Sequence, residues 1–189
     1  VTIGDDKSQD VLRTSMAMGI DRSILVKSSN TLEPLAVAKT LVKIIEKENP
    51  DLVLLGKQAI DDDSNQTGQI LSALMNWPQG CFISELKIED NKLLISREID
   101  EGIEKLETSL PAVLTCDLRL NTPRFASLPN IMKAKKKPLD IIEIDTLGID
   151  TESKIKVLNV VEPPKREAGI MVSDVRELVQ KLKYEAKVI

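Results

Sequence analysis

Residues 34–55, P-L-A-V-A-K-T-L-V-K-I-I-E-K-E-N-P-D-L-V-L-L, contain an amphipathic helix that leads directly into a buried strand. Apolar side chains recur at helical spacing over residues 34–49, and Pro34 suits the first turn, so the pattern predicts a helix there. The run D-L-V-L-L at residues 51–55 predicts a fully buried strand, of the kind that helices cover on both faces. This helix–strand pair indicates an α/β fold.

The residues before this pair show the same alternation of strands and helices. Residues 1–4 and 22–27 are short apolar runs that predict strands, and residues 8–18 predict a helix that Gly19 ends. The order β-α-β-α-β indicates a mainly parallel sheet flanked by helices, and ligands on such sheets lie beyond the carboxyl ends of the strands. Since the first strand has no preceding turn or cap, we expect a further strand–helix unit upstream.

The loop at residues 56–67, G-K-Q-A-I-D-D-D-S-N-Q-T, is a candidate anion site because it joins a strand to the next helix. The amides and the positive dipole end of a helix N-terminus suit a phosphate group, and Ser64, Asn65 and Thr67 are candidate N-cap residues. The carboxylates of residues 61–63 would repel a phosphate unless they face ribose hydroxyls, a magnesium ion or solvent. The alternative is a capped helix with acidic residues in its first turn. The sequence contains no glycine-rich dinucleotide motif and no P-loop.

The second half of the chain changes to short runs in which apolar and polar side chains alternate. These runs lie at residues 82–88, 93–99 and 103–108. Turn residues separate them, which predicts an antiparallel meander. The apolar run at residues 111–114 then returns to the core, and residues 139–144 predict a further strand.

Residues 118–139, L-R-L-N-T-P-R-F-A-S-L-P-N-I-M-K-A-K-K-K-P-L, combine a proline-bounded loop with a short cationic helix. Pro123 and Pro129 keep the intervening residues out of a helix, although Phe125 and Leu128 are large and apolar. One interpretation is an excursion that packs on the core with a solvated lysine face. The other is a docking arm with an apolar anchor and a basic cluster. Nucleic-acid binding is disfavoured by the net charge of −4 and by the lack of aromatic residues among the lysines.

The last residues predict an arm. Residues 155–161 read as an extended segment, and Pro163 and Pro164 then break regular structure. From Ser173 onward the apolar side chains recur at helical spacing, so an amphipathic helix ends the arm. Such a helix either packs on its own domain, which is the commoner case, or reaches another subunit.

Composition removes several classes of chemistry. The 189 residues include no histidine, which excludes Ser-His-Asp and Cys-His nucleophile pairs, His-ligated zinc and His acid/base steps. Cys81 and Cys116 match no metal spacing, which favours a reducing compartment. No apolar run approaches the length of a membrane span. Only carboxylate or lysine chemistry is left, and no pair of acidic residues lies in an apolar setting that would raise a pKa. We therefore expect a protein that is not an enzyme.

Three stretches together resemble the β subunit of electron transfer flavoprotein. Residues 95–115, I-S-R-E-I-D-E-G-I-E-K-L-E-T-S-L-P-A-V-L-T, match the signature of that family, and the resemblance covers essentially every residue of the chain. The 56–67 loop resembles its nucleotide loop, and residues 118–137 resemble its partner-recognition loop. Family chains are longer at the N-terminus, which agrees with the expected upstream unit.

The resemblance implies a Rossmann-like α/β domain over residues 1–161, with an antiparallel meander and a recognition loop at residues 116–138. Residues 162–189 would form a C-terminal arm that contacts an α subunit, which holds most of the FAD. AMP, or in some relatives a second FAD, would bind as a further ligand. The implied nucleotide-binding residues are Ile3, Gly56, Lys57, Gln58, Ala59, Ile60, Asp61, Asp62, Asp63, Ser64, Asn65, Gln66 and Thr67.

The resemblance also implies an electron shuttle of fatty acid β-oxidation. The chain would accept electrons from acyl-CoA dehydrogenases and related flavin dehydrogenases and deliver them to electron transfer flavoprotein-ubiquinone oxidoreductase, in the mitochondrial matrix or a bacterial cytoplasm. Leu128 would be the anchor. The implied partner-binding residues are Pro123, Phe125, Leu128, Pro129, Ile131, Met132, Lys133, Lys135 and Lys136.

Two other interpretations stay open. A stand-alone adenine-nucleotide-binding regulatory domain, related in fold to universal stress proteins, would need a glycine-rich phosphate loop that this sequence lacks. It would also leave Leu128 without a role. An enzyme acting on nucleotides would show turnover of ATP or AMP that depends on residues 61–63.

Overall fold

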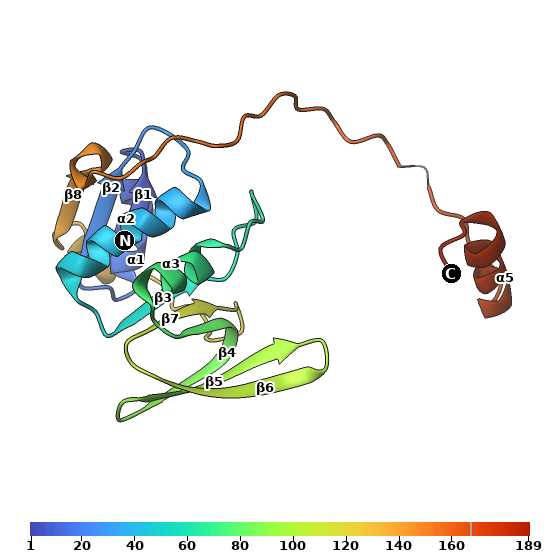
Figure 1. Ribbon diagram of the computed structural model, residues 1–189, viewed down its shortest axis with the longest axis horizontal. Helices are drawn as coiled ribbons and strands as arrows, with labels where there is room; N and C mark the ends of the chain where they lie inside the picture. Colours follow the sequence, from blue (N-terminus) through green and yellow to red (C-terminus); the bar gives the residue numbers. More distant parts are fainter. Residues whose placement is uncertain (167) are drawn as a thin grey trace. The chain divides into compact units, whose positions relative to one another are not determined.

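The computed structural model describes residues 1–166 and 168–189, which divide into two compact units, Val1–Lys154 and Ile155–Ile189 (Figure 1). The first unit contains β-sheets with helices packed against them, and the second contains a short helical segment. The expected α/β fold is therefore confirmed for the first unit.

One sheet of the first unit is parallel throughout. It has the strand order β1-β2-β8, and its strands are β1 (Thr2–Gly4), β2 (Ser23–Lys27) and β8 (Leu139–Glu143). Helix α1 (Ser8–Ala17) connects β1 to β2, and a 3₁₀ turn (Ile144–Leu147) follows β8. The strands and the helix expected from residues 1–27 are thus confirmed, with ends that differ by a residue or two.

The other sheet is mixed. Its order is β3-β7-β4-β5-β6, and its strands are β3 (Leu52–Gly56), β4 (Gln79–Glu89), β5 (Lys92–Ile99), β6 (Gly102–Ser109) and β7 (Ala112–Cys116). Strands β3, β7 and β4 pair in parallel, whereas β4, β5 and β6 form the predicted antiparallel meander. Parallel pairing therefore holds for one sheet and for half of the other, so the mainly parallel arrangement is only partly present.

Two helices cover the parallel part of the mixed sheet. Helices α2 (Pro34–Glu48) and α3 (Thr67–Met75) pack against each other, and Ala38, Leu71 and Val113 are buried where they meet strand β7. The prediction that residues 51–55 form a fully buried strand is wrong: Leu52, Val53 and Leu55 are only partly buried, and Leu54 is 53% exposed. The reason is that β3 pairs with β7 along one edge only, and its other edge lies open.

The remaining elements are short. Helix α4 (Leu128–Ala134) has Pro129 in its first turn, as the sequence indicates. In the second unit, helix α5 (Val175–Gln180) continues into a π turn (Lys181–Glu185). Residues 155–161 have no regular secondary structure, and their apolar side chains are exposed.

Candidate functional site

Two loops begin side by side at the carboxyl ends of the neighbouring parallel strands β3 and β7. The 56–67 loop leaves β3 at Gly56, and the 116–138 segment leaves β7 at Cys116. The Lys57 amide donates a hydrogen bond to the Cys116 carbonyl at 3.2 Å. Both loops therefore occupy the edge at which parallel sheets hold their ligands.

The 56–67 loop is stabilised by contacts among its own polar residues. Asp63 and Asn65 adopt left-handed backbone angles, with φ of 56° and 51°, which Asp and Asn tolerate better than most residues. The Asp61 carboxylate accepts a hydrogen bond from the Asp62 amide at 2.9 Å, and the Asp62 carboxylate accepts one from the Ser64 amide at 3.2 Å. These carboxylates are exposed to solvent, which leaves the helix end behind the loop free of acidic groups.

Helix α3 begins without a side-chain cap. Its N-cap position is Gln66, whose side chain bonds no backbone amide, so the N-cap roles predicted for Ser64, Asn65 and Thr67 are wrong. The alternative of acidic residues in the first turn is wrong as well, because that turn contains none. The first-turn amides are thus free of competition from side chains for an anion.

One cavity joins the end of this loop to strand β1. Its volume is about 620 Å³, and Ile3, Gly56 and Thr67 all line it. Most of its wall is apolar and comes from helix α2 and strand β3. The other predicted nucleotide-binding residues lie on the loop outside the cavity lining, namely Lys57, Gln58, Ala59, Ile60, Asp61, Asp62, Asp63, Ser64, Asn65 and Gln66.

Gln69, which sequence reasoning missed, stands just behind this loop on helix α3. Its Nε2 donates to Oδ1 of Asn65 at 3.3 Å, while its Oε1 is buried with no hydrogen-bond partner among the described residues. A buried acceptor without a donor costs about 1–3 kcal/mol. A donor group on a bound ligand would remove that cost.

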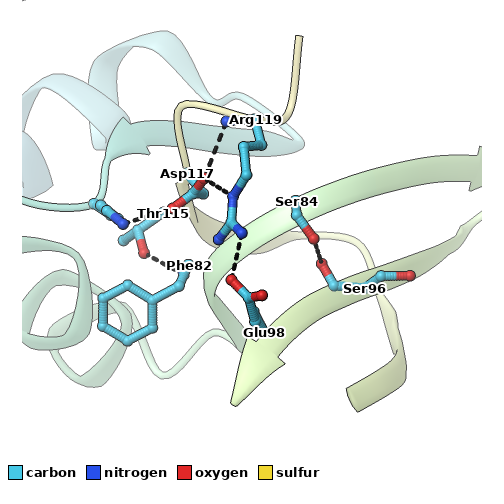
Figure 2. A network of polar contacts seen from close by, with 8 residues as sticks. Phe82, Ser84, Ser96, Glu98, Thr115, Asp117 and Arg119 are labelled. Carbon is cyan, nitrogen blue, oxygen red and sulfur yellow. Dashed lines mark hydrogen bonds and ion pairs between the residues drawn. The ribbon is translucent and has the colours of Figure 1, made fainter. Parts of the chain in front are cut away.

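A buried carboxylate, that of Asp117, connects the two loops, and Figure 2 shows its contacts with Arg119. Asp117 is 4% exposed, and its Oδ2 accepts from the Lys57 ammonium at 2.5 Å. Its Oδ1 accepts from the backbone amide of Arg119 at 3.0 Å and from Nε of the same residue at 2.7 Å. The guanidinium of Arg119 also contacts the carboxylate of Glu98 on strand β5. Hydrogen bonds from Arg119 and Lys57 hold the pKa of Asp117 well below its usual range.

The backbone beneath this carboxylate is fixed as well. The amide of Asp117 donates to the carbonyl of Ile83 at 2.9 Å. Next to it, the Thr115 hydroxyl accepts from the amide of Phe82 at 3.0 Å, where β4 bulges away from regular pairing with β7 (Figure 2). Sequence reasoning missed Asp117, although its place directly after a buried strand was a usable signal.

The 116–138 segment places its large apolar side chains in solvent. Phe125 is 97% exposed and Leu128 is 78% exposed, so the interpretation of this stretch as a core-packing excursion is wrong for both. Ile131 and Met132 on helix α4 are exposed beside them, as are Lys133, Lys135 and Lys136. The segment thus exposes both large apolar side chains and lysines.

Helix α4 is held to helix α1 by two cations that point in opposite directions along the interface. The guanidinium of Arg13 donates to the carbonyls of Ala134 and Lys137, at 2.8 and 2.7 Å. The Lys137 ammonium donates to the carbonyls of Met16 and Ile20, at 3.1 and 2.6 Å. Each cation caps the C-terminal carbonyls of the opposite helix, so Lys137 has a structural contact that its lysine neighbours lack.

The remaining candidate chemistry is limited. Burial raises the pKa of the Cys81 and Cys116 thiols, which disfavours the nucleophilic thiolate form. In residues 1–166 and 168–189, no group of three or more Cys, Asp or Glu side chains is arranged to hold a metal ion. No helix in the same residues is long and apolar enough to cross a bilayer.

Comparison with known proteins identifies the class of protein to which this chain belongs. Residues 1–147 match the family model described as "Electron transfer flavoprotein domain". The chain is 53% identical over 189 residues to the electron transfer flavoprotein subunit beta of Bradyrhizobium diazoefficiens, covering 100% of this chain and 76% of that protein. The corresponding mitochondrial subunit of Arabidopsis thaliana is 52% identical over 191 residues, covering 100% and 76% of the two chains.

The human electron transfer flavoprotein subunit beta is 52% identical over 187 residues, covering 97% of this chain and 73% of that protein. Bacterial, plant and mammalian relatives therefore agree. The chain belongs to the family of electron transfer flavoprotein β subunits.

Proposed function

We propose that the 56–67 loop binds AMP as a structural ligand of this β subunit. The phosphate would lie at the uncapped N-terminus of helix α3, near Asn65, Gln66 and Thr67, and the adenine would lie near Ile3. The observation that carries the proposal is the single cavity that Ile3, Gly56 and Thr67 share. The unpartnered Oε1 of Gln69 would accept a hydrogen bond from the ligand.

The 116–138 segment would dock the acyl-CoA dehydrogenases and related flavin dehydrogenases that donate electrons. Leu128 would enter a hydrophobic pocket of the partner, and the lysines of helix α4 would steer an acidic partner toward it. The exposure of both Phe125 and Leu128 supports this role, because an apolar patch on a folded surface commonly marks an interaction site. Weak and fast docking suits a carrier that must leave again.

The redox chemistry would come from an FAD held mainly by an α subunit. This chain would position its partners and supply no proton-transfer group, because electron tunnelling needs a placed cofactor and brief contacts. Electrons would pass on to electron transfer flavoprotein-ubiquinone oxidoreductase. The setting would be the mitochondrial matrix or a bacterial cytoplasm; the Arabidopsis relative is named as mitochondrial, and another relative is bacterial. Subcellular fractionation would decide between them.

The open sheet edges support the expected further strand–helix unit. Strands β1 and β3 each have one unpaired edge, and residues of both line the 620 Å³ cavity. A parallel strand there would join the two sheets into one and cover Leu54. Slow hydrogen exchange of the β3 amides in a longer form of the protein, against fast exchange in this chain, would support the proposal; equally fast exchange would sink it.

Bound ligands test the nucleotide proposal. The protein is co-expressed with its α subunit, and the small molecules released on denaturation are identified. One FAD and one AMP per heterodimer is the expected result. Two FAD would replace AMP with flavin in the second site, whereas no flavin and no heterodimer would favour the stand-alone regulatory domain.

Leu128→Ala tests the docking proposal. We expect electron acceptance from a dehydrogenase to weaken by about 1–3 kcal/mol, while folding stability changes by less than about 0.5 kcal/mol because the side chain is exposed. Ile103→Ala, at an exposed position on strand β6, is the matched control and should change neither quantity. Unchanged reduction rates in the Leu128 variant would contradict the anchor role.

A further inference from the structure

In the described part of the chain, the Asp117 carboxylate bonds both Lys57 of the 56–67 loop and Arg119 of the 116–138 segment. Lys57, the first residue after strand β3, bonds one carboxylate oxygen. Arg119, near the start of the 116–138 segment, bonds the other with both its amide and its side chain. The two bonds therefore converge on a single rigid group.

The position of that group leaves it little freedom to move. Its side chain is 2% exposed, its backbone amide is bonded to Ile83, and its carbonyl accepts from the Leu120 amide at 3.1 Å. A buried carboxylate that loses one cationic partner is strongly disfavoured, because its desolvation is then uncompensated. A change in the position of Lys57 should consequently change the position of Asp117 and of the Arg119 side chain bonded to it.

We infer that Asp117 is a positioning residue that couples occupancy of the 56–67 loop to the order of the 116–138 segment. The inference rests on the proposed function and adds a way in which that function is regulated. Bound AMP would fix the 56–67 loop and with it Lys57. Through Asp117, it would also fix Arg119 and the start of the docking segment. Ordering that AMP has already provided need not be provided again when a dehydrogenase docks, so the two ligands bind with positive cooperativity. Linkage requires the effect to be reciprocal.

The contacts of each loop indicate that the two sites can be uncoupled without removing either one. Among the described residues, Lys57 is the one predicted AMP residue whose side chain bonds Asp117, so the rest of the nucleotide site stays in place when the carboxylate is neutralised. The C-terminal end of helix α4 is bonded to helix α1 instead, through Arg13 and Lys137. Loss of Asp117 should therefore separate the two sites while leaving each one present.

The test uses the heterodimer with its α subunit, AMP as the nucleotide and an acyl-CoA dehydrogenase as the docking partner. AMP affinity, dehydrogenase affinity with and without AMP, and amide exchange over residues 118–138 are measured for each variant. In the unsubstituted protein we expect AMP to tighten docking at least about fivefold and to slow exchange in that segment. In Asp117→Asn we expect AMP affinity to stay within about threefold and the effect of AMP on docking to fall below about twofold, that is, close to no coupling.

Two further variants keep the test decisive. Arg119→Gln removes the side-chain bond to Asp117 and the contact with Glu98, at a half-exposed side chain, and keeps the Lys57–Asp117 bond. It addresses the same link if Asp117→Asn folds poorly. Glu104→Gln is the control. It breaks the 2.5 Å ion pair between Glu104 and Arg97 on the meander, whose side chains are about as exposed as that of Lys57, and it should keep the full coupling.

If AMP binds without affecting docking or exchange, the coupling alone is overturned. Retained coupling in both the Asp117 and Arg119 variants also overturns it, and failure of AMP to bind the unsubstituted protein overturns the proposed function together with it.

Discussion

Gly68 allows helix α3 to lie closer to strand β7 than a side chain would permit. A Cβ built on Gly68 clashes with Cγ2 of Thr115, a β-branched side chain that is buried and cannot turn aside. We expect Gly68→Ala to lower the free energy of unfolding by about 1–3 kcal/mol, measured by urea denaturation. Thr115→Ser removes Cγ2 but keeps the hydroxyl that Phe82 needs, so adding it to Gly68→Ala should recover most of the loss. If the loss of stability in the double variant equalled the sum of the losses in the two single variants, a clash between Gly68→Ala and Thr115 would be ruled out as the cause.

The carboxylate of Asp117 makes stability depend on pH. Its pKa is lowered in the folded state by hydrogen bonds from Arg119 and Lys57, so its ionised form favours folding. This contribution is complete above the unfolded pKa, near about 4, and declines as pH falls below that value. The difference in unfolding free energy between the unsubstituted protein and Asp117→Asn should therefore be largest near neutral pH and shrink toward strongly acid pH. Urea denaturation across that range measures it, and a difference that is independent of pH would refute the assignment.

At the scale of elements, the lysines in and just after helix α4 divide into two kinds. Lys133, Lys135 and Lys136 are exposed, whereas Lys137 bonds two carbonyls at the end of helix α1. Replacing the exposed three with glutamine should slow dehydrogenase association at low salt and reduce its salt dependence, because steering by exposed charges is screened. Stopped-flow reduction at several ionic strengths measures this.

Lys137→Met is the contrasting variant, since it removes bonds and leaves the exposed charges in place. It should lower the free energy of unfolding by about 1–3 kcal/mol with little change in the salt dependence of association. If the association rate of the unsubstituted protein did not depend on salt, the exposed lysines would have no steering role and would form only a solvated face.

Local patterns predicted these elements well, and pairing between distant elements accounts for the errors. The helix at residues 34–49 and the meander follow from apolar periodicity, which is a local property. Burial of Leu54 depends on what lies beside β3, and the N-cap at Gln66 depends on loop geometry, neither of which the local pattern contains. The bond between Asp117 and Lys57 could not be predicted for the same reason: Lys57 lies on the other loop, 60 residues away, and only the folded sheet brings the two together.

At the scale of the whole molecule, the second unit carries apolar side chains that need a partner. Four of them lie between residues 157 and 161, and all four are exposed: Val157, Leu158, Val160 and Val161. The first unit, Val1–Lys154, holds every buried hydrophobic residue found in the described part of the chain. We therefore expect the first unit to fold without the second.

Removing residues 155–189 should accordingly leave the melting temperature of the first unit within about 2 °C while abolishing its association with the α subunit. Calorimetry measures the first quantity and size-exclusion chromatography of co-expressed subunits the second. A variant with serine at Val157, Leu158 and Val160 keeps the arm at full length but removes apolar area, and stable interfaces of this kind depend on such area. It should weaken the heterodimer in the same direction as the deletion. Normal heterodimer formation by the serine variant, together with loss on deletion, would assign the contact to the helical end of the arm instead of residues 155–161.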